Sequence, residues 1–150
     1  MGYVENLRKL VGHTPLILMG SVVIIINNEN KILLQKRKSP YILWGLPGGL
    51  MELSESTEDT ARREVLEETG LTLGKLKLID VFSGPEYFIK LPNKDEFYVV
   101  TAAYYTNSFN GKIVIDKKES LEFKFIDPYD LPEEMVKSHR KIIETFLSKI

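Results

Sequence analysis

The sequence contains no cysteine. Disulfide bonds, thiolate metal sites and a cysteine nucleophile are therefore excluded. A chain without disulfides suits a reducing compartment, so we expect a cytoplasmic protein. The sequence also lacks a run of about 18 apolar residues and a signal-like apolar segment near its start, so we expect no membrane association.

An excess of charge of one sign is also missing. The chain has 20 basic and 21 acidic residues and a formal net charge of -1. Such a balance gives no overall attraction to nucleic acid or to an anionic membrane, and we expect neither as a partner. The 150 residues, 43% of them hydrophobic, suffice for one domain with a real core, so residues 1–150 are expected to form a single domain. The composition leaves a homodimer open.

Hydrophobic periodicity predicts a strand-rich fold with a few helices. One helix is expected at residues 57–69, between an N-cap at Ser56 and a C-terminal glycine at Gly70. Others are expected at residues 4–11 and after Asp130-Leu131-Pro132. The pattern indicates an α+β or α/β sandwich. Strands are expected at residues 16–26, 31–37, 76–83, 86–91, 96–106, 112–115 and 121–126.

Three glutamates share one face of the helix expected at residues 57–69. Glu64, Glu67 and Glu68 are spaced by three and four residues, which brings their carboxylates together. Acids near a helix C-terminus are slightly unfavourable, and a divalent cation would reverse that effect. Oxygen ligands favour magnesium, manganese or calcium over zinc. Taken alone, three acids at this spacing are more often a solvated helix face.

Neighbouring residues complete the cluster. Arg63 lies four residues before Glu67, so its planar guanidinium could hold a carboxylate in one orientation. Glu55 would reach the same cluster if the preceding loop folds back. The glycines of the Gly45–Gly49 segment would let the backbone approach a metal ion or a phosphate closely.

The whole segment resembles the complete Nudix box. Gly49 is followed after five residues by Glu55, and after seven more by Arg63-Glu64-Val65-Leu66-Glu67-Glu68-Thr69-Gly70-Leu71. All the fixed positions of the box match, and such a pattern is highly specific. One departure is Ser54, where many Nudix hydrolases have glycine.

This resemblance implies a fold and a chemistry. The fold would be an α/β/α sandwich around a mixed sheet, with the box as loop–helix–loop. The activity would be Mg²⁺-dependent hydrolysis, with Mn²⁺ as a substitute, of a phosphoanhydride bond in a nucleoside diphosphate linked to another moiety. Glu64, Glu67, Glu68 and the Gly48 carbonyl would be the metal ligands. Arg63 and Glu55 would orient them.

Further site residues lie outside the box. The resemblance places a general base either in the box or on a later glutamate, and Glu119 is the first candidate, with Glu96 and Glu122 as rivals. Arg37, at a strand end, is a candidate phosphate contact. His13 and His139 are expected to be structural or at the surface. The aromatic candidates for stacking on a base are Trp44, Phe82, Tyr87 and Phe88. Aromatic residues near strands more often belong to the core than to a base-binding site.

One alternative function remains open, a non-catalytic Nudix-fold domain that senses a nucleotide or RNA, although the intact set of box glutamates favours an enzyme. The identity of the substrate also remains open. Pro85, 14 residues after Leu71, resembles ADP-ribose-cleaving members, whereas Tyr87, two residues later, resembles dinucleoside-polyphosphate-cleaving members. Nucleoside triphosphates are equally open.

Overall fold

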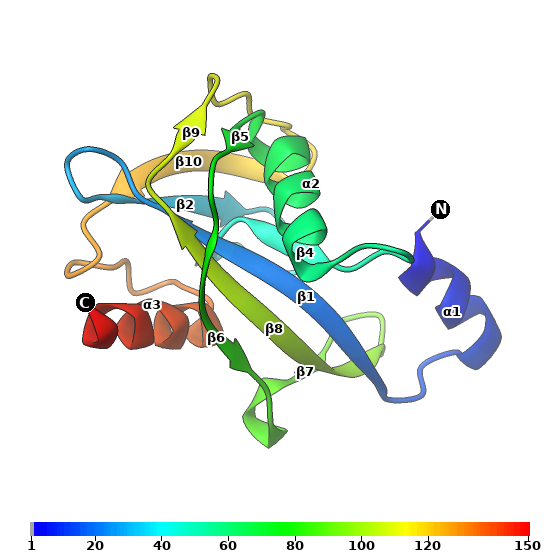
Figure 1. The fold of residues 1–150 in the computed structure, drawn as a ribbon. Helices are drawn as coiled ribbons and strands as arrows, with labels where there is room; N and C mark the ends of the chain where they lie inside the picture. The colour runs from blue at the N-terminus through cyan, green and yellow to red at the C-terminus, as the bar shows by residue number, and fades with distance from the viewer. Residues whose placement is uncertain (1) are drawn as a thin grey trace.

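A computed structural model of the protein describes residues 2–150 (Figure 1). Within this range no helix is long and apolar enough to cross a bilayer. The cytoplasmic location stays a prediction. In chain order the elements are α1 (Tyr3–Val11), β1 (Leu16–Ile25), β2 (Ile32–Arg37), β3 (Trp44–Gly45), β4 (Gly48–Leu50), α2 (Thr57–Thr69), β5 (Thr72–Leu73), β6 (Lys77–Phe82), the 3-10 turn η1 (Pro85–Tyr87), β7 (Phe88–Lys90), β8 (Glu96–Thr106), β9 (Phe109–Asn110), β10 (Ser120–Ile126) and α3 (Lys137–Lys149).

The main sheet is mixed. Its strand order is β4-β1-β8-β6, and β7 also pairs with β8. The long strands β1 and β8 run parallel, in a register from Leu16 opposite Phe97 to Ile25 opposite Thr106, while the other pairs are antiparallel. A second sheet has the order β10-β2-β3, and β5 pairs with β9. The mixed sheet predicted from the family resemblance is confirmed.

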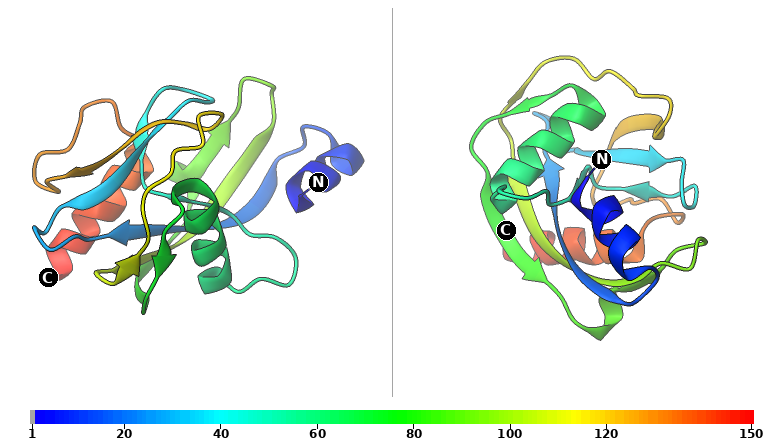
Figure 2. Two further views of the ribbon diagram at one scale, coloured as in Figure 1. Left: turned by 90° about the horizontal axis from the view of Figure 1, so that it is seen from above. Right: turned by 90° about the vertical axis from the view of Figure 1, so that its right-hand side faces the viewer.

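From Gly20 to Ile25, strand β1 is buried on both faces. Val22 and Ile24 pack with Ile143 and Phe146 of α3, whereas alternate residues such as Val23 pack with Ala61 and Val65 of α2. The view from above shows α2 and α3 on opposite sides of β1 (Figure 2, left). Burial on both faces explains why β1 reads as a continuous apolar run instead of an alternating one. The expected sandwich of helix, sheet and helix is confirmed.

Local signals placed α2 correctly. The Ser56 side chain accepts a hydrogen bond from Asp59 N, and the Asp59 side chain accepts one from Ser56 N. These bonds satisfy two donors that a helix start otherwise leaves unpaired. Gly70 ends the helix with φ 79°, a left-handed conformation that suits glycine. The prediction for residues 57–69 is confirmed.

Three predictions for short segments were wrong in whole or in part. The final helix starts at Lys137, well after Pro132, because Val136 N donates to Trp44 O and Trp44 N donates to Glu134 O. This pairing with β3 keeps the chain extended. Residues 112–115 form no strand, since Val114 N instead binds Thr69 O at the end of α2. Of the strand expected at residues 86–91, Phe88–Lys90 is present as β7, but Pro85–Tyr87 form a 3-10 turn.

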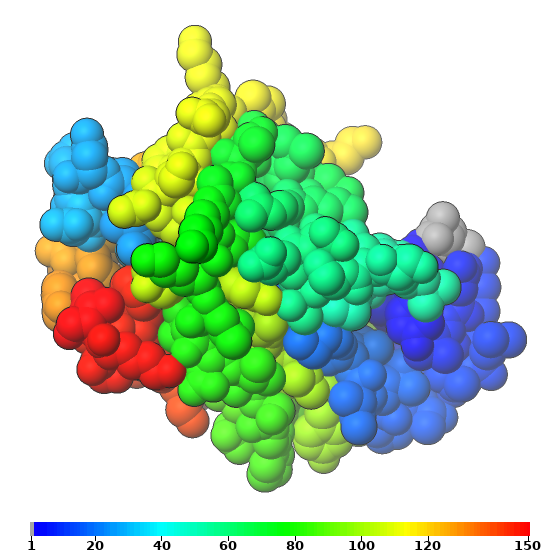
Figure 3. All heavy atoms as spheres, in the orientation of Figure 1, coloured from blue at the N-terminus to red at the C-terminus, as the bar shows by residue number. Residues whose placement is uncertain are grey.

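Helix α1 lies apart from the sandwich, at one end of the molecule (Figures 1 and 3). It buries none of its residues. It is tethered by hydrogen bonds from Tyr3 N to Glu52 Oε1 at 2.8 Å and from Arg8 Nη2 to Glu96 O at 2.7 Å. The homodimer that the sequence left open stays a prediction.

Candidate functional site

The loop before β4 requires glycine at position 48. Gly48 has φ 152°, and a Cβ atom there would overlap Ser21 O and lie 2.7 Å from Val22 Cα. The loop is held against β1, because Val23 N donates to Pro47 O at 3.0 Å. Gly48 N points to α2 and donates to Glu68 Oε1 at 2.9 Å. The first part of the box is thus bound to both the sheet and the helix.

Glu68 is a buried carboxyl group, with only 8% of the residue exposed. Burial raises the pKa of Glu68 to about 8, while the hydrogen bond from Gly48 lowers it and the charge of Glu64 raises it. Burial penalises the ionised form of an acid because water no longer solvates it. The Glu68 carboxylate therefore lacks sufficient positive charge around it.

Glu64 is in a similar situation. Burial raises its pKa, and Arg63 only partly opposes that effect. A Cβ on Gly49 would lie 2.6 Å from both Glu64 carboxylate oxygens, so only glycine lets Glu64 pack against this strand. Glu64 and Glu68 consequently stand side by side with the glycine backbone in the wall of one cavity.

Arg63 and Glu55 form a bidentate ion pair. Nε donates to Glu55 Oε2 at 2.5 Å and Nη2 to Oε1 at 3.0 Å. The Arg63 hydrogen bond lowers the pKa of Glu55 to about 2. Arg63 Nη1 also contacts Glu64 at 2.9 Å and Glu67 at 3.3 Å, and Nη2 donates to Leu50 O at 3.0 Å. This geometry suits the orienting role that the resemblance gave to both residues.

Glu67 points to Arg63 instead of the cavity. Its side chain is 58% exposed, and it is absent from the cavity lining. Over residues 2–150 no three His, Asp or Glu side chains gather closely enough to enclose a metal ion. The ligand set Gly48, Glu64, Glu67 and Glu68 thus stays a prediction. A buried and a half-buried carboxylate with raised pKa values do fit a hard cation such as Mg²⁺, which binds oxygen ligands.

The cavity measures about 430 Å³ and has two chemically distinct ends. At the acidic end Gly48 pairs with Val22 of β1, and at the apolar end Phe97 pairs with Leu16 of the same strand. Six residues of extended strand separate these positions by roughly 20 Å. A cavity of this size is typical for small-molecule ligands. The apolar end and the adjoining wall are lined by Ile89, Phe97, Val99 and Val136.

Arg37 and His139 both line the cavity and lie close together. A Cβ on Gly45 would lie 3.0 Å from His139 Nδ1 and 3.1 Å from Arg37 Nε. His139 Nδ1 accepts a hydrogen bond from Leu46 N at 2.9 Å. Burial, and next the charge of Arg37, lower the pKa of His139 well below its usual value, so the ring is neutral. The surface alternative for His139 was wrong.

The structure brings Glu119 to the box acids. Glu119 lines the cavity, and its charge raises the pKa of Glu64. Of its rivals, Glu122 is exposed on β10 and Glu96 starts β8, and neither lines the cavity. Gln35 lines the cavity too, although neither Gln35 nor His139 carries a motif that would have singled it out in the sequence.

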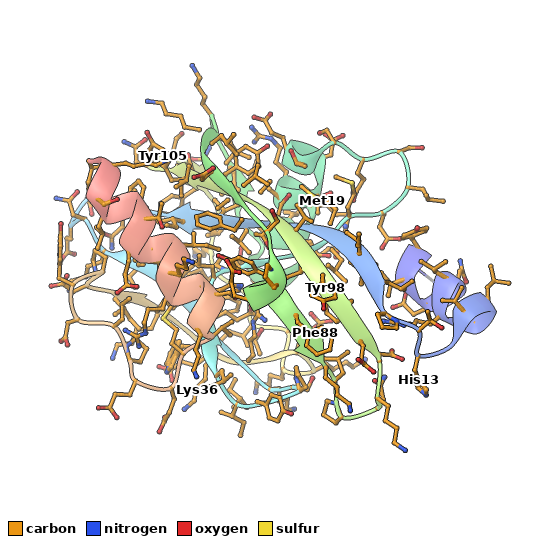
Figure 4. The ribbon with its side chains drawn as sticks, turned by 90° about the horizontal axis from the view of Figure 1, so that it is seen from below. His13, Met19, Lys36, Phe88, Tyr98 and Tyr105 are labelled. Carbon is orange, nitrogen blue, oxygen red and sulfur yellow. The ribbon has the colours of Figure 1, made fainter. Side chains whose placement is uncertain are left out.

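The aromatic candidates lie elsewhere. Trp44 packs on the core, with Lys36 Nζ 5.9 Å from its ring centroid. Tyr87 is buried against Phe82, with ring centroids 6.5 Å apart. Phe88 lies against Tyr98 with centroids 5.1 Å apart (Figure 4). None of these side chains lines the cavity. Phe97 is the aromatic residue that does.

Comparison with known proteins agrees with this geometry. The family model described as NUDIX domain matches residues 18–146. The chain belongs to the Nudix family. This Nudix protein is 32% identical over 125 residues to the ADP-ribose pyrophosphatase of Methanocaldococcus jannaschii, a match covering 82% of the chain and 69% of that protein. The Nudix hydrolase predicted from the box is confirmed.

Two further relatives widen the comparison. A Bacillus subtilis (strain 168) protein with the provisional name 8-oxo-dGTP diphosphatase is 34% identical over 127 residues, or 85% of this chain and 78% of that one. The crystal structure of a MutT Nudix hydrolase from Burkholderia pseudomallei superposes with a TM-score of 0.74 at 26% identity, covering 86% of this Nudix chain and 97% of that one.

Proposed function

We propose that this Nudix hydrolase cleaves, with Mg²⁺, a phosphoanhydride bond in a nucleoside diphosphate linked to another moiety. The observation that carries the proposal is the pair Glu64 and Glu68, two poorly solvated carboxylates in one cavity wall whose pKa values are raised. A divalent cation bound there would neutralise phosphate charge and acidify a water molecule.

Gly48, Glu64 and Glu68 would hold the cation, and Glu67 would join them by leaving Arg63. That move costs little, because an exposed ion pair contributes at most about 1 kcal/mol. Arg63 would keep Glu55 and Glu64 as partners after the move. This Arg63 clamp, formed with Glu55 and Glu64, therefore persists when Glu67 turns to the metal ion.

Arg37 would bind the substrate phosphates. It lines the cavity, and its guanidinium has no carboxylate within 4 Å over residues 2–150. Its one hydrogen bond, from Nη2 to Leu46 O, is 3.3 Å long. A guanidinium with free donors is well suited to phosphate oxygens. Glu119, at the same cavity, would accept the proton of the attacking water.

The nucleoside would occupy the apolar end, against Phe97 and Val99. In this proposal Phe97 takes the base-stacking role first expected of Trp44 and Tyr87, since Tyr87 lies in the core and Trp44 packs against it. Relatives with different named substrates, ADP-ribose and 8-oxo-dGTP, share about a third of their residues with this chain. What these two compounds have in common is the nucleoside diphosphate part, and this part is the substrate class that we propose.

The test is a panel of 8-oxo-dGTP, dGTP, ADP-ribose and a dinucleoside tetraphosphate, assayed with Mg²⁺, Mn²⁺ or excess chelator. We expect metal-dependent cleavage of at least one compound and a loss of about 100-fold or more in Glu68→Gln. The matched control is Glu58→Gln, an exposed glutamate in the first turn of the same helix, which should keep wild-type turnover. Tight binding of a nucleotide without any cleavage would instead support a sensing domain.

A further inference from the structure

Strand β10 contains one extra residue next to the cavity. Glu122 pairs with Lys36 of β2, so regular pairing would place Leu121 opposite Arg37. Instead the register shifts and Ser120 takes that position, which leaves two residues of β10 opposite one of β2. Leu121 is 44% exposed, whereas Ser120 is 1% exposed. The bulge thus turns Ser120 inward and Leu121 outward, as bulges beside active sites often do.

The inward Ser120 meets Gln35. Gln35 Nε2 donates to Ser120 Oγ at 2.6 Å, and Gln35 is only 2% exposed. Gln35 also lines the cavity together with Glu68 of the box helix. The Gln35–Ser120 pair therefore joins the wall of that cavity to the first residue of β10.

Glu119 directly precedes Ser120. Its carboxylate makes no hydrogen bond or ion pair with any part of residues 2–150, so its position depends on the backbone that carries it. That backbone is held by Lys38, whose N donates to Glu119 O at 3.2 Å and whose Nζ donates to Lys117 O at 2.8 Å, and by bonds within residues 116–120. In the described chain, the Gln35–Ser120 bond is the one side-chain pair that links residues 116–120 to the cavity wall.

We propose that Gln35 and Ser120 are positioning residues that fix the Glu119 loop relative to the box carboxylate Glu68. The inference rests on the proposed function, in which Glu119 accepts a proton. Buried hydrogen bonds between rigid strands hold their neighbours within narrow limits, and a shift of about 1 Å at a catalytic group can cost about 100-fold in rate. The β10 bulge is the feature of the backbone that makes this pairing geometrically available.

The test is a double-mutant cycle on turnover. Ser120→Ala should lower kcat about tenfold with KM changed less than about twofold. In a Glu119→Gln background, Ser120→Ala should cause no further loss, because the group that it positions is already disabled. Leu121→Ala, the neighbouring control that keeps the bulge and the bond, should match the wild type. Equal losses from Ser120→Ala in both backgrounds overturn the inference, as does an unchanged kcat in Glu119→Gln.

A second readout needs neither metal nor substrate. Lys117 and Lys118 are exposed in the same loop. Trypsin should cut after them several times faster in Ser120→Ala than in the wild type or Leu121→Ala, with an unchanged thermal midpoint. Unchanged cleavage overturns the inference. If the wild-type protein hydrolyses nothing, the proposed function fails, while this readout still decides whether the bond holds the loop.

Discussion

Gly48 N and Glu68 Oε1 are 2.9 Å apart, joined by a buried hydrogen bond between the glycine loop and the box helix. This single bond is not enough to stabilise the Glu68 charge, because the pKa of Glu68 remains raised to about 8. Without a metal ion, the ionised Glu68 therefore lowers the free energy of unfolding of the protein. Four predictions follow from the way in which the charges of this site are arranged.

The first prediction concerns the metal-free protein and pH. Because the pKa of Glu68 is about 8 when folded and about 4.5 when unfolded, the folded state binds the proton more tightly. The stabilisation of the folded protein by protonated Glu68 is complete below about pH 4.5 and is lost as the pH rises through about 8. Each pKa unit is equivalent to about 1.4 kcal/mol. Urea unfolding in chelator should show Glu68→Gln gaining stability over the wild type between pH 5 and 8. Parallel pH profiles for the two proteins would contradict this burial penalty.

The second prediction concerns metal binding. A cation competes with the proton on Glu68 and Glu64, both of which have raised pKa values. Added Mg²⁺ should therefore raise the thermal midpoint more at pH 8 than at pH 6. Calorimetry should show that Glu68→Gln abolishes most of the rise in thermal midpoint that Mg²⁺ causes in the wild type, whereas Glu58→Gln keeps that rise. An equal shift at both pH values would place the cation elsewhere.

The third prediction concerns the Arg63 clamp. Arg63→Lys keeps the charge but cannot make the two bonds to Glu55 and the bond to Glu64 together. We expect a loss of about tenfold or more in kcat and a destabilisation of about 1–2 kcal/mol. Arg62→Lys is the matched control, since Arg62 donates only to Leu73 O. If the two variants behave alike in a steady-state assay, the clamp does not orient the acids.

The fourth prediction concerns Arg37. Arg37→Ala should lower kcat/KM by about tenfold or more, because it removes phosphate-binding donors from the cavity. Lys36→Ala is the control from the adjacent position, since Lys36 (labelled in Figure 4) lies over the Trp44 ring and does not line the cavity. Kinetics with two substrates that differ only in the base should show the same loss for both. A loss confined to one base would mean that Arg37 contacts the nucleoside.

Local chemistry explains what the sequence predicted well. The start and end of α2 depend on Ser56, Asp59 and Gly70, which all act within a few residues, so the pattern placed both ends correctly. The Nudix box is likewise one continuous segment. Its residues were identified together, even though the contact between Glu55 and Arg63 itself depends on how the loop folds back.

The errors and omissions come from contacts across the chain. Trp44 pairs with residues 134–136 and delays α3, and nothing near Pro132 announces that partner. Tyr87 directly precedes β7 and Phe97 lies in β8, yet only Phe97 lines the cavity. Composition and spacing alone do not distinguish them. His139 lines the cavity because a helix far along the chain reaches Leu46.

The contacts of the site also differ in the length of chain that each one closes. The contacts of the box, such as Gly48 with Glu68, join residues about 20 positions apart, whereas Gln35 and Ser120 are 85 positions apart. Closing a longer loop costs more chain entropy, so short-range contacts tend to form first. The box side of the site therefore depends on short-range contacts, whereas the link that places Glu119 depends on one of the longer chain closures in the site, and we expect that link to form later in folding.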